Sequence, residues 1–95
     1  MAAYVILDIT VEDPESYETY KALAGKALAA YEGRFLVRGG AHEVIEGEWN
    51  PNRVVVLEFD SRERAKAWYH SEEYAPALKI RQSASTAHMI LVEGA

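Results

Sequence analysis

The chain has 95 residues, a formal net charge of −5 and no cysteine; 49% of its residues are hydrophobic and 26% are charged. This composition is ordinary for one globular domain, which we expect to occupy residues 1–95. It excludes disulfides and thiolate chemistry, and an acidic chain without a basic run argues against nucleic acid as a partner.

Membrane association is not indicated by the sequence either. No apolar stretch approaches the roughly 18 residues of a membrane span, and no basic segment followed by a long apolar run marks a signal peptide. We therefore expect no membrane as a partner and, by default, a cytoplasmic protein.

The first two predicted elements are a strand and a helix. Residues 4–11 are rich in β-branched and aromatic side chains and contain no breaker, which indicates a strand. Asp13 and Pro14 then begin a helix, because the carboxylate can accept from free backbone N–H groups and proline needs no N–H in the first turn. Apolar residues recur at helical spacing until Gly33, which we expect to end the helix with a positive φ.

The middle of the chain predicts two strands joined by a hairpin. Residues 34–38 indicate the second strand, which the glycines at 39–40 interrupt as a bulge or bend would, and which residues 43–47 continue. Turn-forming residues at 49–52 lead into the third strand, 53–59, which we expect to pair antiparallel with the second.

The last third of the chain predicts a helix, a break and a strand. Residues 62–70 indicate the second helix. Ser71 is expected to cap a further short helical piece over residues 75–81. Residues 86–92 indicate the fourth strand.

The order β-α-β-β-α-β predicts a ferredoxin-like α+β fold, with a four-stranded antiparallel sheet and the helices on one face, since parallel crossovers are right-handed. The other face stays open, although its residues, among them Ile6, Val56 and Ile90, are largely apolar too. Exposed apolar area of this kind usually marks an interface. We therefore expect a homodimer that packs sheet to sheet through the open face.

Several local motifs together resemble a known family over nearly the whole chain. They are Asp13-Pro14-Glu15 with Tyr17 and Tyr20, Tyr31-Glu32-Gly33-Arg34, Arg38-Gly39-Gly40, Glu46-Gly47, Arg53-Val54-Val55-Val56-Leu57-Glu58-Phe59, Ala67-Trp68-Tyr69-His70-Ser71-Glu72-Glu73-Tyr74, Arg81 and Glu93-Gly94. The chain resembles the domain of unknown function 1330 family, within the dimeric α/β-barrel superfamily. It departs from the family pattern at Glu32, where a second glycine is usual, and at Glu72, where proline is common.

The resemblance implies a ferredoxin-like fold and a homodimer, and it supplies no reaction. Other members of the superfamily include cofactor-free oxygenases, haem-degrading enzymes, isomerases and ligand-sensing modules. A shared fold does not choose among these activities.

Four polar residues are expected among the apolar side chains of the open face: Asp8, Arg38, Glu58 and His88. An ionised group in an apolar interface is costly unless it is paired. One interpretation is a structural ion-pair cluster, for instance Arg38 with Glu58 or with Asp8. The alternative is a polar patch beside a cavity, with Asp8, Glu58 or His88 as a catalytic acid or base.

A second set of candidates lies in and after the second helix. Trp68 occupies a helical position typical of a core residue, whereas Tyr69 and Tyr74 carry hydroxyls that need partners when buried. Together with Arg38 and Arg81, these aromatic residues are the predicted ligand-binding residues, in a pocket between sheet and helices.

Arg81 has two possible roles. Its guanidinium could hold an anionic ligand in a bidentate grip. It could equally pair with an acidic neighbour, and we favour this second role, with Glu72, Glu73 or Glu93 as the partner.

No metal site and no cofactor is predicted, because the three histidines lack ligand spacing and no glycine-rich phosphate loop is present. Two hypotheses of different class remain. The first is a homodimer that binds a small, partly apolar organic molecule, either without acting on it or as a cofactor-independent enzyme. The second is a non-catalytic dimer, ligand-sensing or structural, whose polar residues fix the register of its two sheets.

Overall fold

The strands and helices follow the predicted order, and the short helical piece expected over residues 75–81 is a helix of ten residues. The computed structural model describes all residues 1–95. The elements are β1 (Ala3–Val11), α1 (Pro14–Ala30), β2 (Arg34–Arg38), β3 (Arg53–Phe59), α2 (Arg62–Tyr69), α3 (Ala75–Ala84) and β4 (Ser85–Glu93).

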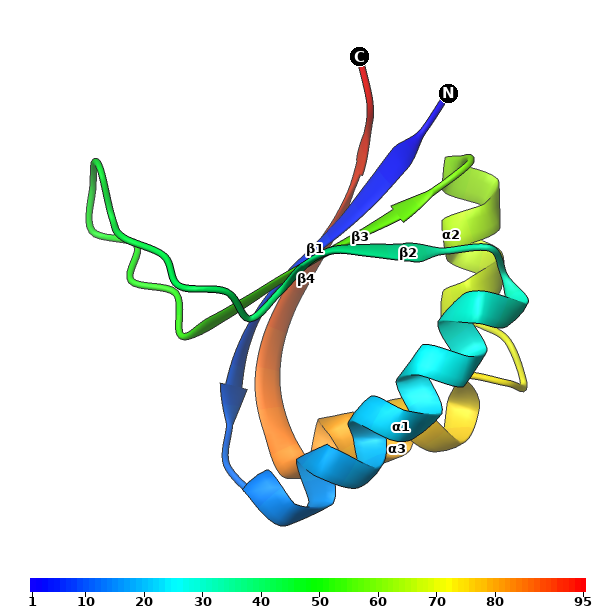
Figure 1. The fold of residues 1–95 in the computed structure, drawn as a ribbon, viewed down its shortest axis with the longest axis horizontal. Coiled ribbons are helices and arrows are strands. Elements are labelled where there is room, and N and C mark those ends of the chain that lie inside the picture. Colours follow the sequence, from blue (N-terminus) through cyan, green and yellow to red (C-terminus); the bar gives the residue numbers. More distant parts are fainter.

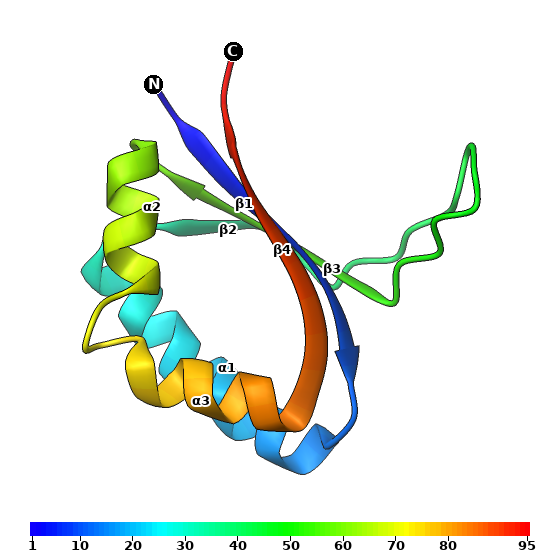
Figure 2. The same cartoon turned by 180° about the vertical axis from the view of Figure 1, so that it is seen from behind.

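The four strands form one antiparallel sheet in the order β2-β3-β1-β4. All three helices lie on the same face of this sheet (Figure 1), and the view from behind shows the opposite face without a helix (Figure 2). The arrangement confirms the predicted ferredoxin-like α+β fold. No helix in the structure is both long and apolar enough to cross a membrane.

The core lies between the sheet and the helices. Alternate residues of β1 point toward the helices, so Val5, Leu7 and Ile9 are buried, as the pattern of the sequence predicts. On β3 the buried residues are Leu57, which pairs with Val5, and its neighbours on the same face. The alternation of both central strands therefore fixes which face the helices cover.

The two ends of α1 are built from local hydrogen bonds. Asp13 caps the first turn by accepting from the backbone N–H of Ser16 at 3.3 Å and from its hydroxyl at 2.8 Å. These bonds to Ser16 lower the pKa of Asp13. The predicted start of the helix is confirmed.

The end of α1 differs from the prediction. Glu32, not Gly33, takes the left-handed conformation, with φ 59°, and the N–H groups of Glu32 and Gly33 return to the carbonyls of Ala29 and Leu28. Gly33 is needed for space instead, because a Cβ there would lie 2.3 Å from Leu28 Cδ1 and 2.8 Å from Phe59 Cε1. The family pattern usually has a glycine at position 32, which fits its backbone conformation.

The connection between β2 and β3 is also different from the prediction. Residues 43–47 form no strand, and residues 39–52 make an arm that projects from the sheet on the side away from the helices (Figure 1). Gly39 turns the chain out of β2 with φ 70°, and no strand lies beside the arm to pair with it. Local β-propensity does not hold a strand without a partner. The arm leaves Ile45 86% exposed and Trp49 63% exposed.

Candidate functional site

A narrow cavity lies between α1 and the sheet. Its floor is apolar and includes Leu7 and Ile9 from β1 and Val55 from β3, and Trp68 of α2 also lines it. About 420 Å³ of space lies inside the cavity and its open mouth together, but the cavity itself measures only about 30 Å³. Any ligand larger than about one or two water molecules would therefore have to displace the side chains that line it.

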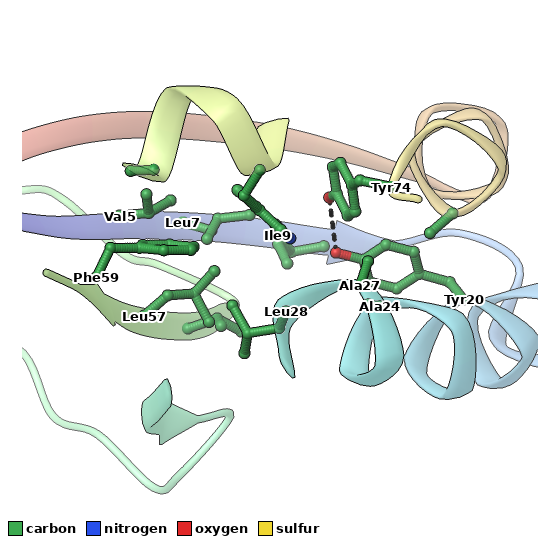
Figure 3. Close-up of a cluster of buried hydrophobic side chains, with 14 of the residues drawn as sticks. Val5, Leu7, Ile9, Tyr20, Ala24, Ala27, Leu28, Leu57, Phe59 and Tyr74 are labelled. Atoms are coloured by element: carbon green, nitrogen blue, oxygen red, sulfur yellow. Dashed lines mark hydrogen bonds between the residues drawn. The ribbon is translucent and has the colours of Figure 1, made fainter. Parts of the chain in front are cut away.

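The cavity exists because α1 packs mainly against α3, whereas α2 packs directly on the sheet. Large side chains from the helices fill the part of the space between α1 and the sheet that the cavity leaves. Tyr20 of α1 and Tyr74, which immediately precedes α3, point toward each other there (Figure 3). Their hydroxyls are hydrogen-bonded at 3.0 Å, and both residues are buried.

Arg81 of α3 completes this polar group, which we call the tyrosine–arginine group (Tyr20, Tyr74 and Arg81). Its Nε donates to the hydroxyl of Tyr74 at 3.4 Å, and the residue is only 6% exposed. Burial lowers the pKa of Arg81, but the hydrogen bond to Tyr74 and the other phenols outweigh this and leave the pKa raised. Burial beside Tyr74 raises the pKa of Tyr20. The group thus combines a charged guanidinium with a neutral phenol at Tyr20.

The predicted acidic partner of Arg81 is wrong. Glu73 accepts from the hydroxyl of Tyr31, and Glu93 lies 3.6 Å from Arg62. Arg81 forms no salt bridge and instead meets phenol oxygens, because α3 turns its side chain inward, toward the core, and away from these surface carboxylates.

Ser71 holds Tyr74 in place. Its hydroxyl accepts from the backbone N–H of Tyr74 at 3.0 Å and donates to the carbonyl of Trp68 at 2.7 Å. The sequence predicts that the Ser71 hydroxyl caps a helix by accepting such a bond. In the structure the bond closes a turn before the helix, and α3 begins at Ala75. Ser71 therefore fixes the spacing between Trp68 and Tyr74, whose rings lie 4.3 Å apart.

Three cationic side chains line the cavity: Lys21, Arg38 and Arg53. The guanidinium of Arg38 lies over the ring of Phe35 at 4.2 Å, and that of Arg53 lies over Tyr17 at 5.6 Å. Lys21 approaches the same tyrosine ring at 5.8 Å. Aromatic faces thus hold these cations beside an apolar space.

The position of Arg38 corrects the prediction that it lies on the open face with Asp8 and Glu58. A register shift between Phe35 and Val37 breaks the alternation of β2, and Arg38 pairs with Val55, whose side chain faces the helices. A bulge reverses the face on which the following residues lie. Arg38 consequently lines the cavity instead of the sheet interface.

Two donors of the cavity-lining residues have no hydrogen-bond partner. They are Arg53 Nε and Trp68 Nε1, and both atoms are buried. Arg53 lies close to the backbone of Gly39, since a Cβ at that position would be 2.2 Å from its Nη1. A buried donor without a partner costs free energy, so such atoms in a native structure call for an explanation.

The three predicted acid–base residues lie on the other face of the sheet. Asp8 accepts from Trp49 Nε1 and from the backbone N–H of Asn52, each at 3.0 Å, and the bond from Trp49, with that from Asn52, lowers its pKa. Glu58 pairs with Arg34, and neither Glu58 nor Asp8 pairs with Arg38, in contrast to the interpretation of an ion-pair cluster. The structure therefore does not bring these carboxylates to the cavity.

His88 lies directly across from Asp8 on the adjacent strand and is exposed. No three His, Asp or Glu side chains are close enough together to hold a metal ion. Tyr69 is half-buried and lines a surface groove between α2 and β4, not the cavity, although its ring lies 6.0 Å from that of Tyr74. Of the five predicted ligand-binding residues, Arg38 and Trp68 line the cavity, and Tyr74 and Arg81 reach it through Tyr20.

Sequence reasoning missed the contribution of Tyr20, Lys21 and Arg53 to this cavity. Tyr20 falls among the apolar residues at helical spacing in the first helix, and its hydroxyl, which needs a partner when buried, is the available signal. Arg53 shares its face of β3 with Val55 and Leu57, so strict alternation places it toward the helices.

Comparisons with known proteins agree with this architecture. A model of the family described as "Domain of unknown function (DUF1330)" matches residues 2–95, which confirms the family resemblance predicted from the sequence. A search among curated proteins finds no significant match.

Several solved structures are similar in fold. A protein of unknown function from Rhodopseudomonas palustris superposes with a TM-score of 0.81 at 16% identity, over 99% of this chain and 82% of that one. SnoaB, a cofactor-independent oxygenase from Streptomyces nogalater, gives a TM-score of 0.64 at 15% identity, over 99% and 92% of the chains. A dimeric ferredoxin-like protein of unknown function from Thermobifida fusca gives 0.67 at 17% identity, over 99% and 92%.

Proposed function

Because the chain belongs to the DUF1330 family, whose name assigns no activity, we propose a function from the cavity itself: the protein binds a small, partly apolar organic molecule between α1 and the sheet. The ligand would lie on the apolar floor formed by Leu7, Ile9 and Val55. The side chains of Tyr20, Arg38 and Arg53 would supply the polar groups of the site. Ligand sites are commonly concave and apolar, with a few polar groups that fix orientation.

The observation that carries this proposal is the pair of unpaired donors, Arg53 Nε and Trp68 Nε1. Both belong to residues that line the same cavity, and Trp68 is only 2% exposed. Leaving such groups buried without a partner costs about 1–3 kcal/mol each. An acceptor atom on a ligand would supply the missing hydrogen bonds.

The geometry favours binding over acid–base catalysis by the predicted residues. No aspartate or glutamate lines the cavity, and Asp8 and Glu58 are held by partners on the other face of the sheet. The similarity to SnoaB, a cofactor-independent oxygenase, supports a small organic ligand and does not transfer the reaction.

We also propose that the protein forms a homodimer through its open sheet face. Ile90 is 58% exposed and Val92 is 42% exposed on this face, beside the exposed apolar residues of the arm. An apolar surface of this kind is normally covered by a partner. The similarity to a dimeric ferredoxin-like protein supports a second copy as that partner. The binding cavity lies on the helix side and stays accessible in such a dimer.

The test of binding uses a variant that fills the cavity. Ala24 of α1 lines it and is 6% exposed, so Ala24→Leu places three additional carbon atoms inside. Ala22→Leu adds the same atoms at an exposed position of the same helix and serves as the control. Indole, 2-naphthol and 2-naphthoate are titrated into each protein and followed by ¹H–¹⁵N correlation spectra.

We expect shifts confined to the cavity-lining residues in the wild type and in Ala22→Leu, and weak or absent shifts in Ala24→Leu. Urea unfolding shows that each variant is folded, since overpacking costs about 1–3 kcal/mol. The proposal fails if none of the three compounds binds, or if they bind Ala24→Leu as well as the wild type.

A further inference from the structure

The charges around the cavity have one sign. Among its 13 lining residues three are cationic and none is acidic. In the whole chain, by contrast, acidic residues outnumber basic ones by 15 to 10. A concave, low-dielectric site lined by one sign of charge concentrates ligands of the opposite sign.

The arginines of this site lack counter-ions. Arg38 and Arg53 form no salt bridge, whereas Lys21 lies 3.2 Å from Glu18. Arg81, behind the cavity, likewise pairs with no carboxylate. Two guanidinium groups thus line one apolar space, and a third lies behind it, with no salt bridge to any of the three.

The turn at Gly39 packs closely against the guanidinium group of Arg53. Gly39 leaves room for Arg53, whose Nη1 would lie 2.2 Å from a Cβ there. The N–H of Gly39 donates to the carbonyl of Val54 at 2.8 Å, which ties the turn to β3 beside that arginine. The Nε of Arg53 nevertheless stays unpaired, as does the indole N–H of Trp68. The unpaired Nε of Arg53 suits an oxygen of an anion.

We propose, on the basis of the proposed binding function, that the ligand is an organic anion, namely a small carboxylate with a flat apolar body. The body lies against Leu7, Ile9 and Trp68. The carboxylate accepts from Arg53 at the mouth, and Arg38 adds a second positive charge. Guanidinium groups match the planar, two-oxygen geometry of a carboxylate.

The test compares 2-naphthoate with 2-naphthamide, which have nearly the same shape and differ in charge. Both are titrated into ¹⁵N-labelled protein, and the indole N–H signal of Trp68 reports binding; Trp49→Phe assigns the only other indole signal. We expect 2-naphthoate to bind at least about tenfold more tightly, a difference of about 1.4 kcal/mol. The preference should weaken as salt is added, because the mouth is open to solvent.

Removal of the arginines should abolish the preference. In Arg53→Met, and in Arg38→Met if the first variant is unstable, the ratio of the two affinities should fall below about threefold, because the favourable charge is lost. Arg62→Met makes the same substitution and charge change on α2, outside the cavity, and should retain the preference.

The possible outcomes separate this inference from the function on which it rests. Equal binding of both compounds would overturn the anion while leaving a ligand-binding cavity. An unchanged preference in Arg53→Met and Arg38→Met would overturn the assigned residues. If neither compound bound, this inference would be wrong, and the titrations with indole and 2-naphthol would then decide whether the proposed function is wrong as well.

Discussion

Replacing Tyr74 by phenylalanine removes one hydroxyl from the centre of the tyrosine–arginine group. The hydroxyl of Tyr20, 3.0 Å away and in a residue only 8% exposed, would lose its partner. A buried polar group left unpaired costs about 1–3 kcal/mol. Loss of the longer 3.4 Å bond from Arg81 adds about 0.5–1.5 kcal/mol. We therefore expect Tyr74→Phe to lower the free energy of unfolding by about 2–4 kcal/mol.

The assay is urea unfolding followed by tryptophan fluorescence and circular dichroism at one protein concentration, since association would shift the midpoint. Tyr17→Phe is the control: this residue is 4% exposed, its hydroxyl makes no hydrogen bond within the protein, and the change should cost less than about 0.5 kcal/mol. The double variant Tyr20→Phe/Tyr74→Phe should lose less than the sum of the singles, because it leaves no phenol hydroxyl unpaired there. A cost below about 0.5 kcal/mol for Tyr74→Phe, or strict additivity in the double variant, would refute the reasoning.

Three further predictions concern the turn, the open face and the arm. Gly39→Ala should lower the free energy of unfolding by about 1–2 kcal/mol, because residue 39 has a left-handed backbone conformation. The added Cβ should also displace Arg53 and so weaken the binding of 2-naphthoate. Gly40→Ala is the control: open space surrounds this residue, and neither effect is expected. Ile90→Asp should convert the proposed dimer to a monomer in sedimentation analysis, because it would bury a charge in the proposed sheet interface; an unchanged dimer mass would place the interface elsewhere, and a monomeric wild type would overturn the proposed dimer. The lowered pKa of Asp8 in the folded state means that its contribution to stability is present above its ordinary value near about pH 4 and is lost as the pH falls through the folded value. Urea midpoints measured down to acidic pH should therefore fall less steeply for Asp8→Asn than for the wild type, and equal slopes would show that the carboxylate does not hold the arm.

Much of the fold was predictable because it depends on local pattern. The alternation of Val5, Leu7 and Ile9 fixes the buried face of β1, and the cap at Asp13 fixes the start of α1. The left-handed residue at the end of α1 was misplaced by one position, since Gly33 is present for a close contact with Leu28 and not for its φ. A glycine in a sequence does not by itself indicate whether the backbone needs a positive φ there or a neighbouring side chain needs the space.

The site was less predictable because it depends on contacts between distant segments. A single bulge in β2 moves Arg38 from the open face to the cavity, and no residue between Phe35 and Val37 is of a type that predicts a bulge. The inward direction of Arg81 follows from the packing of α3 on α1, so its choice of Tyr74 over nearby carboxylates could not be read from spacing. The sequence predicts Trp68 as a core residue and marks Tyr69 and Tyr74 as tyrosines whose hydroxyls need partners when buried, but only the structure separates the half-buried Tyr69 from the buried Tyr74.

The most direct test of a ligand-binding cavity is native mass spectrometry of protein purified gently from cells, with wild type and Ala24→Leu prepared side by side. The account predicts that the wild type is a dimer carrying a small organic acid, and that Ala24→Leu is a dimer without it. A wild type without bound ligand, or the same added mass on both proteins, would contradict the assignment of the cavity between α1 and the sheet as the functional site.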